Sequence, residues 1–151
     1  MISLPDGYTI STDSSLLNID VIHGFLAESY WARNMPRTLV ERMVRHSLNF
    51  GVYYLGKQAG FARVISDYTT FAYVADVFIL SEHRGKGLSK ALVGTILAHP
   101  NLQGLRRWML VTLDAHGVYE SFGFKLVEYP ERHMEIHRPA IYERPPDSKE
   151  A

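Results

Sequence analysis

The chain has 151 residues, which suits one domain, and a domain of this size can bury about 70% of the surface that its unfolded chain exposes. Its 16 Lys and Arg residues balance 16 Asp and Glu residues, and the resulting net charge of zero argues against a nucleic-acid-binding protein. The lack of cysteine excludes disulfides, thiolate metal sites and a cysteine nucleophile, and it suits a reducing cytosol.

Nothing in the sequence predicts a membrane segment. No apolar run reaches the roughly 18 residues of a membrane span, and the first residues lack the basic start and apolar core of a signal peptide. The histidines have no spacing that demands a metal ion, so we expect no metal. We therefore expect a cytoplasmic protein with one domain over residues 1–151, in which 139–151 form a C-terminal extension.

The first part of the chain predicts one strand and two helices. Residues 8–11 favour a strand, and residues 19–30 favour a helix with apolar side chains on one face. Asn18 or Asp20 can cap the start of this helix. Pro36 can open a second helix that runs to about residue 46, because proline is well suited to a first helical turn.

The middle of the chain predicts a hairpin, a long strand and another helix. Residues 50–55 and 58–65 form the hairpin around Gly56 and Lys57. Residues 70–80 form the long strand, which ends in a continuous apolar run. Apolar residues then recur at helical spacing; they are Leu88, Leu92, Val93 and Ile96.

The last part predicts a strand over 108–112, a short helix over 115–121 that Asp114 can cap, and a further strand from Phe124. The region around His133 and His137 is also expected to be a strand.

Between the long strand and the helix lies a basic glycine loop, Arg84-Gly85-Lys86-Gly87. Unpaired N–H groups at a helix N-terminus, with cations beside glycines, favour a phosphate group. A Walker loop and a dinucleotide fingerprint do not fit, since the first spacing is absent and the second needs a glycine where Lys90 stands.

The run from Arg84 to Ser89 resembles the R-x-x-G-x-[GA] motif that binds the acyl-CoA pyrophosphate in the GCN5-related N-acetyltransferases (GNAT). Ser89 departs from the pattern, which has glycine or alanine there. The resemblance implies acetyl-CoA as cosubstrate. It implies the following residues in its phosphate site: Arg84, Gly85, Lys86, Gly87, Leu88 and Ser89. The alternative is a helix start whose glycines serve only a turn.

A second segment resembles the same family. The positions of its A-x-x-[LF]-Y-x-x-x-G-F pattern fall on Ala115, Val118, Tyr119, Gly123 and Phe124, with valine where the pattern has leucine or phenylalanine. In the family this tyrosine commonly protonates the departing CoA thiolate, so the resemblance implies that Tyr119 is the general acid. A tyrosine with a pKa of about 10 is protonated at neutral pH. The alternative is an aromatic side chain that packs the helix on the sheet.

The family's fold implies an α/β (α+β) protein with a mixed, mostly antiparallel twisted sheet and helices on both faces. It also implies that the pantetheine arm of the cofactor lies along the backbone of Val77, Phe78 and Ile79, where a main-chain N–H near Val77 or Phe78 would support the oxyanion. Packing of these side chains in the core does not exclude binding by their backbone.

The general base is open. Asp76 is a charge in an apolar run, which calls for a partner or a function. It is a candidate to accept the proton of the amine, directly or through water, or it pairs with Arg63 on the neighbouring strand. Glu82 is a weaker candidate, and a chain of water molecules is a third answer.

In the family the first two helices wall the acceptor site. Glu28, Tyr30 and Trp31 lie there, and we expect them to bind the substrate, with Glu28 holding a cationic amine. The alternative is that Tyr30 and Trp31 close the helix on the sheet.

Taken together, these residues predict an N-acetyltransferase that acts on a small-molecule amine or an amino acid by direct attack in a ternary complex. Two alternatives stay open. One is a non-catalytic acyl-CoA-binding module of the same fold, because fold does not fix function. The other is an enzyme that acetylates proteins or peptides. A homodimer is a further expectation, since dimers are frequent in the family.

Overall fold

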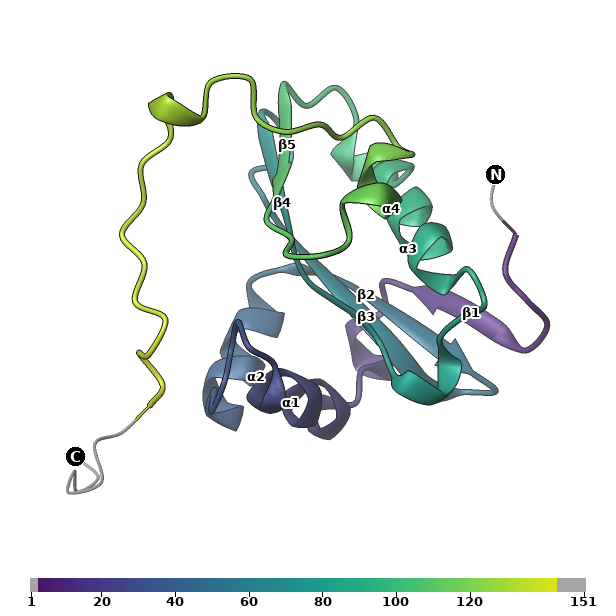
Figure 1. Cartoon of the computed structure of the whole chain (residues 1–151). Coiled ribbons are helices and arrows are strands. Elements are labelled where there is room, and N and C mark those ends of the chain that lie inside the picture. Colours follow the sequence, from purple (N-terminus) through teal and green to yellow (C-terminus); the bar gives the residue numbers. More distant parts are fainter. Residues whose placement is uncertain (1–2, 144–151) are drawn as a thin grey trace.

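The computed structural model describes residues 3–143 and is built around one five-stranded sheet (Figure 1). The strands lie in chain order: β1 (Tyr8–Ser11), β2 (Leu48–Tyr54), β3 (Lys57–Ser66), β4 (Phe71–Ile79) and β5 (Arg107–Leu110). Neighbouring strands are antiparallel except β4 and β5, which are parallel. The predicted mixed, mostly antiparallel sheet is confirmed.

Helices cover both faces of this sheet, as predicted. Two lie on one face and two on the other: α1 (Ile19–Glu28) with α2 (Arg37–Arg45), and α3 (Leu88–Leu97) with α4 (His116–Glu120). Short 3-10 turns occur at Ser14–Leu16, Ser81–His83, Pro100–Leu102 and Pro130–Arg132. Within residues 3–143, no helix combines the length and the hydrophobicity that a bilayer crossing requires.

The two sides of the sheet bury separate hydrophobic clusters. On one side, Leu92 and Ile96 of α3 pack with Phe50 and Val52 of β2. On the other, the apolar faces of α1 and α2 pack against the sheet around Phe61 of β3. Each face of the sheet is therefore fixed by its own helix pair, which positions the strands between them.

The first helix starts where the sequence predicts but ends earlier. The Asn18 side chain accepts hydrogen bonds from the backbone N–H groups of Asp20 and Val21, so Asn18 is the N-cap. The helix ends at Glu28 and not at residue 30, because the Ser29 hydroxyl donates to the Leu26 carbonyl (2.6 Å) and accepts from the next turn of chain.

The predicted hairpin of β2 and β3 is present, and its turn lies one residue earlier than expected. Leu55 and Gly56 both have positive φ, 48° and 84°. Two such residues in a two-residue loop match the twist of the flanking strands.

A β-bulge interrupts β4. Phe61 pairs with Phe78 and Arg63 pairs with Ala75, so Ala62 alone stands opposite two residues of β4, Asp76 and Val77. Asp76 has φ 54°, in the left-handed region that aspartate tolerates better than most residues.

The parallel pairing of β4 with β5 is short. It runs from Phe71 and Arg107 to Val74 and Leu110, and β4 then continues to Ile79 without a β5 partner. The second half of β4 therefore has a free edge on the β5 side, next to the chain that leads to α4 (Figure 1).

Three predictions about the last third of the chain are wrong. In the described part of the chain no strand begins at Phe124, and none lies around His133 and His137; this segment runs outside the hydrogen-bonded sheet. Asp114 does not cap α4, since Ala115 is the N-cap and the Thr112 hydroxyl accepts from its N–H (3.1 Å). Of the expected extension, residues 139–143 form turns, and 144–151 lie outside the described residues.

Candidate active site

The phosphate loop (residues 84–89) has the backbone that an anion site requires. Gly85 and Gly87 each have φ 77°, and a Cβ on either would meet nothing within 4 Å. Both positions therefore require glycine because of their left-handed backbone conformation, and not because a Cβ would clash with other protein atoms. Such turns aim successive N–H groups in one direction.

The first turn of α3 leaves its donors free. Gly87 is the N-cap and no side chain caps the helix. The first bond within the helix runs from the Ala91 N–H to the Gly87 carbonyl (3.1 Å), so the N–H groups of residues 88–90 have no partner in the helix. They carry the positive end of the helix dipole.

A cavity of about 230 Å³ lies at this loop. Five of the six predicted phosphate-loop residues line it, and Lys86 does not. Ile79, His83, Lys90 and Val118 also line it, so the cavity joins the end of β4, the start of α3 and α4. Lys90 was not identified from the sequence as a second cation beside Arg84 in this cavity. Its position in the first turn of α3 could have indicated it.

Two side chains hold the loop in place. The Arg84 Nε donates to the Ile79 carbonyl (3.0 Å), which ties the loop to the end of β4. A short hydrogen bond of 2.7 Å joins the Tyr8 hydroxyl and the His83 Nδ1, which ties the preceding turn to β1. Arg84 thus supports the loop as well as contributing its charge.

The predicted pantetheine strand has the geometry for backbone binding. Phe78 and Ile79 are buried and Val77 is half-buried, with their side chains packed in the two clusters. Their backbone pairs with β3 on one edge only, since β5 has already separated from β4. Core packing and a free backbone edge therefore coexist in this segment.

Asp76, at the bulge, is the centre of a polar cluster. It forms an ion pair with Arg63, which is the pairing that the sequence offered as an alternative. Its other oxygen accepts from the Trp31 Nε1 (2.8 Å). The side chains of Asp76 and Arg63 are only 8% and 17% exposed. Arg63 also donates to the Ser47 hydroxyl (3.2 Å).

Aromatic rings extend this cluster along α1. Phe25 stacks on Phe78, with ring centroids 4.0 Å apart and planes 8° apart. Trp31 lies beside Phe25, and Tyr30 meets Trp31 edge-on at 5.1 Å. The sequence predicts Phe25 only as a core residue. Its position on the same helix as Glu28 was the one indication that it also lies beside the acceptor side of the site.

The three predicted substrate residues differ in their surroundings. Trp31 touches the Asp76 cluster and Tyr30 touches Trp31, whereas Glu28 is exposed at the end of α1 and forms no ion pair within residues 3–143. Tyr30 and Trp31 are 67% and 40% exposed, so this wall of the site is open.

Tyr119 is buried on α4, and its ring meets Phe124 edge-on at 5.8 Å. No hydrogen bond to its hydroxyl occurs within the described part of the chain. Burial raises the pKa of Tyr119 above its ordinary value of 10.0. The phenol is therefore protonated at neutral pH and free to donate.

Among residues 3–143, no three His, Asp or Glu side chains gather in a way that suits a metal ion.

Comparisons with known proteins identify the family. The model of the acetyltransferase (GNAT) family matches residues 18–124. A candidate acetyltransferase of Gibberella zeae is 33% identical, over 78% of this chain and 79% of its own.

Solved structures agree. A crystal structure of a candidate GNAT acetyltransferase from Xanthomonas campestris pv. campestris is 50% identical with a TM-score of 0.90, over 94% of this chain and 100% of that one. The fold is also shared with a Clostridium acetobutylicum protein solved with acetyl-CoA, at 14% identity and a TM-score of 0.65, over 86% and 94% of the two chains. The chain belongs to the GNAT acetyltransferases, a family that uses acetyl-CoA.

Proposed function

We propose that this protein transfers the acetyl group of acetyl-CoA to a primary amine of a small molecule or an amino acid, in a ternary complex. One observation carries the proposal. The free edge of β4 leads from the Trp31–Asp76 cluster at the bulge to the unpaired N–H groups of α3. An extended thioester cofactor fits such a track, with an anion at one end and an acceptor at the other.

The cofactor is expected to bind chiefly through backbone groups. Its pyrophosphate would accept from the N–H groups of residues 88–90, with Arg84 and Lys90 as the cations that line the cavity and Lys86 as a further cation of the loop. Its pantetheine arm would pair with the free edge of Val77, Phe78 and Ile79, as an added strand does.

In the reaction, the amine nitrogen attacks the thioester carbonyl carbon and the C–S bond breaks. A main-chain N–H near Val77 or Phe78 would stabilise the developing oxyanion; such a donor contributes about 3 kcal/mol in other enzymes. Tyr119 would donate its phenol proton to the leaving thiolate.

The proton of the attacking amine needs an acceptor, and we assign it to Asp76. Its two oxygens each accept one hydrogen bond, from Trp31 and Arg63. A carboxylate has about four lone-pair sites, so it retains capacity to accept a proton directly or through water.

A peptide or protein acceptor is the second candidate, and one observation favours it. Glu28, Tyr30 and Trp31 are all exposed, Tyr30 to 67% and Trp31 to 40%, so this side of the site is accessible to a larger acceptor. A non-catalytic acyl-CoA-binding module is the third.

Substitution of Tyr119 tests the catalytic assignment. We expect Tyr119→Phe to lower kcat for thiol release by about 100-fold, the lower end of general acid catalysis, with acetyl-CoA affinity nearly unchanged. Because burial raises the pKa of Tyr119, the parent enzyme should lose activity only above pH 10, and this alkaline limb should vanish in the variant. Tyr129→Phe, on the C-terminal segment, is the matched control.

The outcome also separates the candidates. If calorimetry shows acetyl-CoA binding but no amine, amino acid or peptide releases thiol, the protein is a binding module. If only peptides release thiol, the acceptor assignment is wrong and the acetyl transfer stands. An unchanged rate in Tyr119→Phe means that another group protonates the thiolate.

A further inference from the structure

The acceptor side of the site contains an ion pair whose arginine uses only some of its donors. The Nε of Arg63 donates to the Asp76 carboxylate, and its Nη1 donates to the Ser47 hydroxyl (3.2 Å). Its Nη2 donates to no group within residues 3–143. A guanidinium has five N–H donors, so Arg63 keeps donors for a further acceptor.

The unused nitrogen of Arg63 is accessible to solvent. In the described part of the chain, the buried side-chain nitrogen and oxygen atoms that lack a hydrogen-bond partner are Asn49 Oδ1 and the Tyr53 hydroxyl. Arg63 Nη2 lacks a partner and is not one of these atoms, so it is not buried. A small anion can therefore reach it and accept a charge-assisted hydrogen bond.

Asp76 offers the complementary group. Its two oxygens accept hydrogen bonds from Trp31 and Arg63, and two of its about four lone-pair sites stay free. A free cationic donor and a free anionic acceptor thus lie close together. An α-amino acid has the opposite arrangement, with an ammonium group and a carboxylate on one carbon atom. It adds no net charge to the neutral pair, so neither of its charges is left without a partner.

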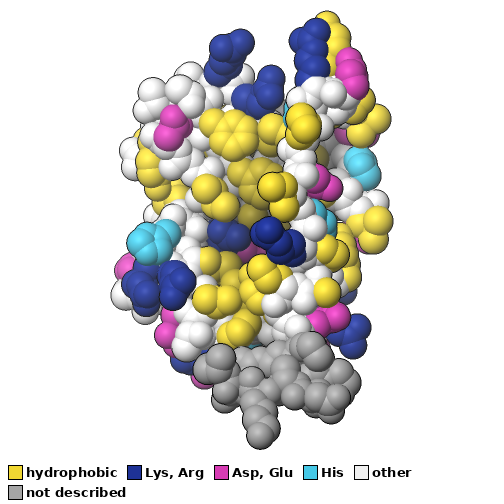
Figure 2. Space-filling model, turned by 90° about the vertical axis from the view of Figure 1, so that its left-hand side faces the viewer, with side chains coloured by type: hydrophobic (Ala, Val, Ile, Leu, Met, Phe, Trp, Pro, Cys, Tyr) yellow, Lys and Arg dark blue, Asp and Glu magenta, His cyan; other side chains and the backbone are white. Residues whose placement is uncertain are grey.

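The surface beside the ion pair is aromatic. The Trp31 ring, which donates to Asp76, is 40% exposed, and half-buried Phe25 lies beside it with ring centroids 6.1 Å apart. Figure 2 shows the face of the molecule that the C-terminal segment crosses, on which charged side chains near the middle lie among hydrophobic ones. Aromatic surface of this kind favours an acceptor with an apolar side chain.

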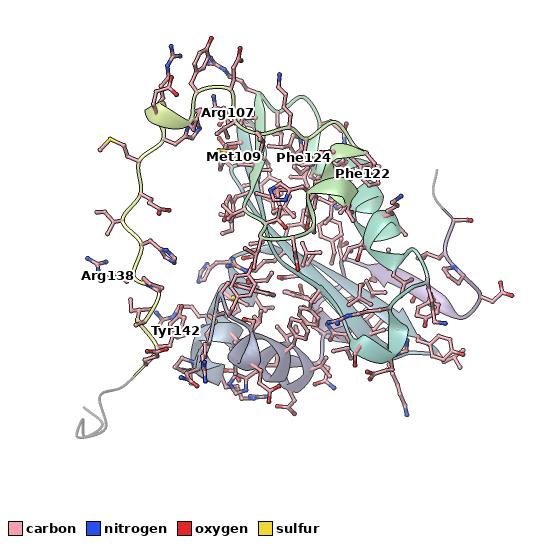
Figure 3. The ribbon with its side chains drawn as sticks, viewed as in Figure 1. Arg107, Met109, Phe122, Phe124, Arg138 and Tyr142 are labelled. Atoms are coloured by element: carbon pink, nitrogen blue, oxygen red, sulfur yellow. The ribbon has the colours of Figure 1, made fainter. Side chains whose placement is uncertain are left out.

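The C-terminal arm (residues 125–143) also borders this region. It runs in extended form to Tyr142, which packs against the cluster of α1 and α2 (Figure 3). Burial raises the pKa of Tyr73 on β4, and the charges of Asp76 and Glu135 raise it further. Glu135 of the arm therefore lies near the ion pair. A carboxylate at this border disfavours an acceptor with an acidic side chain.

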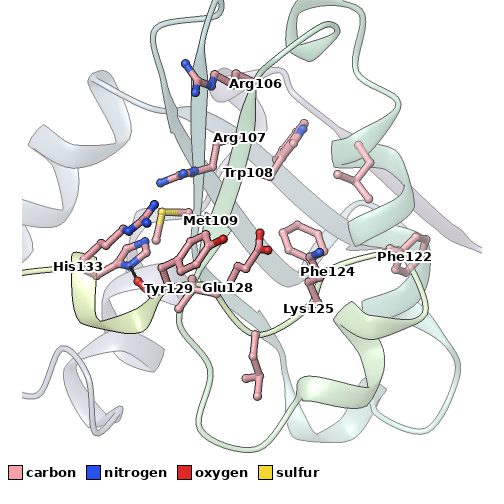
Figure 4. Close-up of a pocket in the computed structure, with 15 residues that line it drawn as sticks. Arg106, Arg107, Trp108, Met109, Phe122, Phe124, Lys125, Glu128, Tyr129 and His133 are labelled. Carbon is pink, nitrogen blue, oxygen red and sulfur yellow. Dashed lines mark hydrogen bonds between the residues drawn. The ribbon is translucent and has the colours of Figure 1, made fainter.

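A second cationic region of the molecule is separate from this one. A cavity of about 690 Å³ lies between β5 and residues 122–133 (Figure 4). Its lining includes four cations: Arg106, Arg107, Lys125 and Arg132. No residue of β4 lines it, so an amine bound there would lie away from the strand along which the cofactor is proposed to bind.

We propose that the acceptor is a free α-amino acid with an apolar side chain. Its carboxylate binds the free donors of Arg63, and its amino group lies at Asp76. Its side chain packs on the Trp31 ring. This inference rests on the proposed acetyl transfer and specifies the acceptor.

The reaction then balances as follows for this acceptor. The α-ammonium group first gives one proton to water, which leaves a neutral amine. The amine nitrogen bonds to the thioester carbonyl carbon and the C–S bond breaks. Asp76 takes one proton from the nitrogen, and Tyr119 gives one proton to the thiolate. The products are an N-acetyl amino acid and the CoA thiol.

Three substrates that differ at the carboxylate test the inference. L-phenylalanine has the carboxylate, L-phenylalanine amide carries a neutral amide as a peptide N-terminus does, and phenethylamine lacks the group. In a thiol-release assay, kcat/KM for L-phenylalanine should be about 100-fold above that of the other two, the effect of a hydrogen bond to a charged group. Equal values, or a higher value for the amide or the amine, would overturn the inference and leave acetyl transfer intact.

A fourth substrate tests the position of the side chain. L-aspartate has the same α-carboxylate but an acidic side chain, so its kcat/KM should be about tenfold below that of L-phenylalanine. A value equal to that of L-phenylalanine would contradict the placement of the side chain on Trp31.

Arg63→Lys tests the carboxylate contact itself. Lysine keeps the charge beside Asp76 but has one nitrogen in place of the guanidinium fork. The ratio of kcat/KM for L-phenylalanine to that for its amide should fall about tenfold. A general loss of activity or stability cancels in this ratio, because both substrates meet the same variant. Arg107→Lys, in the larger cavity, is the matched control and should leave the ratio unchanged. The reverse result would place the carboxylate in the larger cavity.

A binding measurement separates this inference from the proposed function. In equilibrium dialysis with free CoA present, L-phenylalanine should bind and its amide should not. If acetyl-CoA binds but no substrate releases thiol, acetyl transfer is wrong, and selective binding of L-phenylalanine would still support the amino-acid site. Failure of L-phenylalanine to bind, or equal binding of its amide, would refute that site.

Discussion

The cofactor side and the acceptor side of the site are built in different ways. On the cofactor side, the contributing groups are mainly backbone atoms from one continuous stretch, from the bulge of β4 to the first turn of α3. On the acceptor side, they are side chains from separate elements: Trp31 follows α1, Arg63 lies on β3 and Asp76 lies on β4.

This difference indicates which substitutions should disrupt each side of the site. A backbone site depends on the conformation of the chain, so it tolerates changes of side chain except at glycines with positive φ. A side-chain site depends on charge and hydrogen bonding, so it fails when one partner is lost. The two sides share the bulge at Asp76.

The largest effect is expected on the cofactor side. Gly87→Glu places a carboxylate where the pyrophosphate is proposed to bind and forces glutamate to φ 77°, so we expect acetyl-CoA binding to be lost in calorimetry. Gly104→Glu is the matched control, because Gly104 has φ 74° and equally open space but lies away from the loop. Equal loss in both variants would mean that backbone strain, not the anion site, is responsible.

The next effect is on stability, at the shared bulge. Arg63→Met strands the Asp76 carboxylate without its cation, and breaking such a buried pair typically costs about 3–5 kcal/mol of unfolding free energy. Asp76→Asn in the same chain should recover part of the loss, because asparagine is neutral and tolerates positive φ. Urea unfolding measures both. A loss below about 1 kcal/mol would mean that the pair behaves as a surface salt bridge.

The smallest effect is expected on the acceptor side. Trp31→Phe keeps an aromatic ring but removes the donor to Asp76, so we expect the KM for the amine to rise roughly threefold to tenfold, the worth of one hydrogen bond. The affinity for acetyl-CoA should not change. The opposite pattern, weaker cofactor binding with the same amine KM, would place Trp31 on the cofactor side.

The difference between a site built from one continuous stretch and a site built from distant side chains also determines how much of each side the sequence predicts. The fold class and the phosphate loop follow from local patterns, because the alternation of strands, helices and glycines is written in neighbouring residues. The contact of Trp31 with Asp76 joins residues that are distant in the chain, and no local pattern indicates it. The missing strand at Phe124 has another cause: the residues favour a strand, but within the described chain they find no edge at hydrogen-bonding distance.

The bulge of β4 also has a consequence for how this strand tolerates length changes. Before it, Ala72 and Val74 face the cluster of α3; after it, Val77 and Ile79 face that cluster, whereas Phe78 faces α1. The extra residue thus shifts the two halves of β4 out of phase by one position. Deleting Asp76 would remove the bulge and restore strict alternation, with Val77 and Ile79 still facing α3 and Phe78 still facing α1. The bulge therefore adds the charged side chain of Asp76 to the strand without changing which cluster each apolar side chain of β4 contacts.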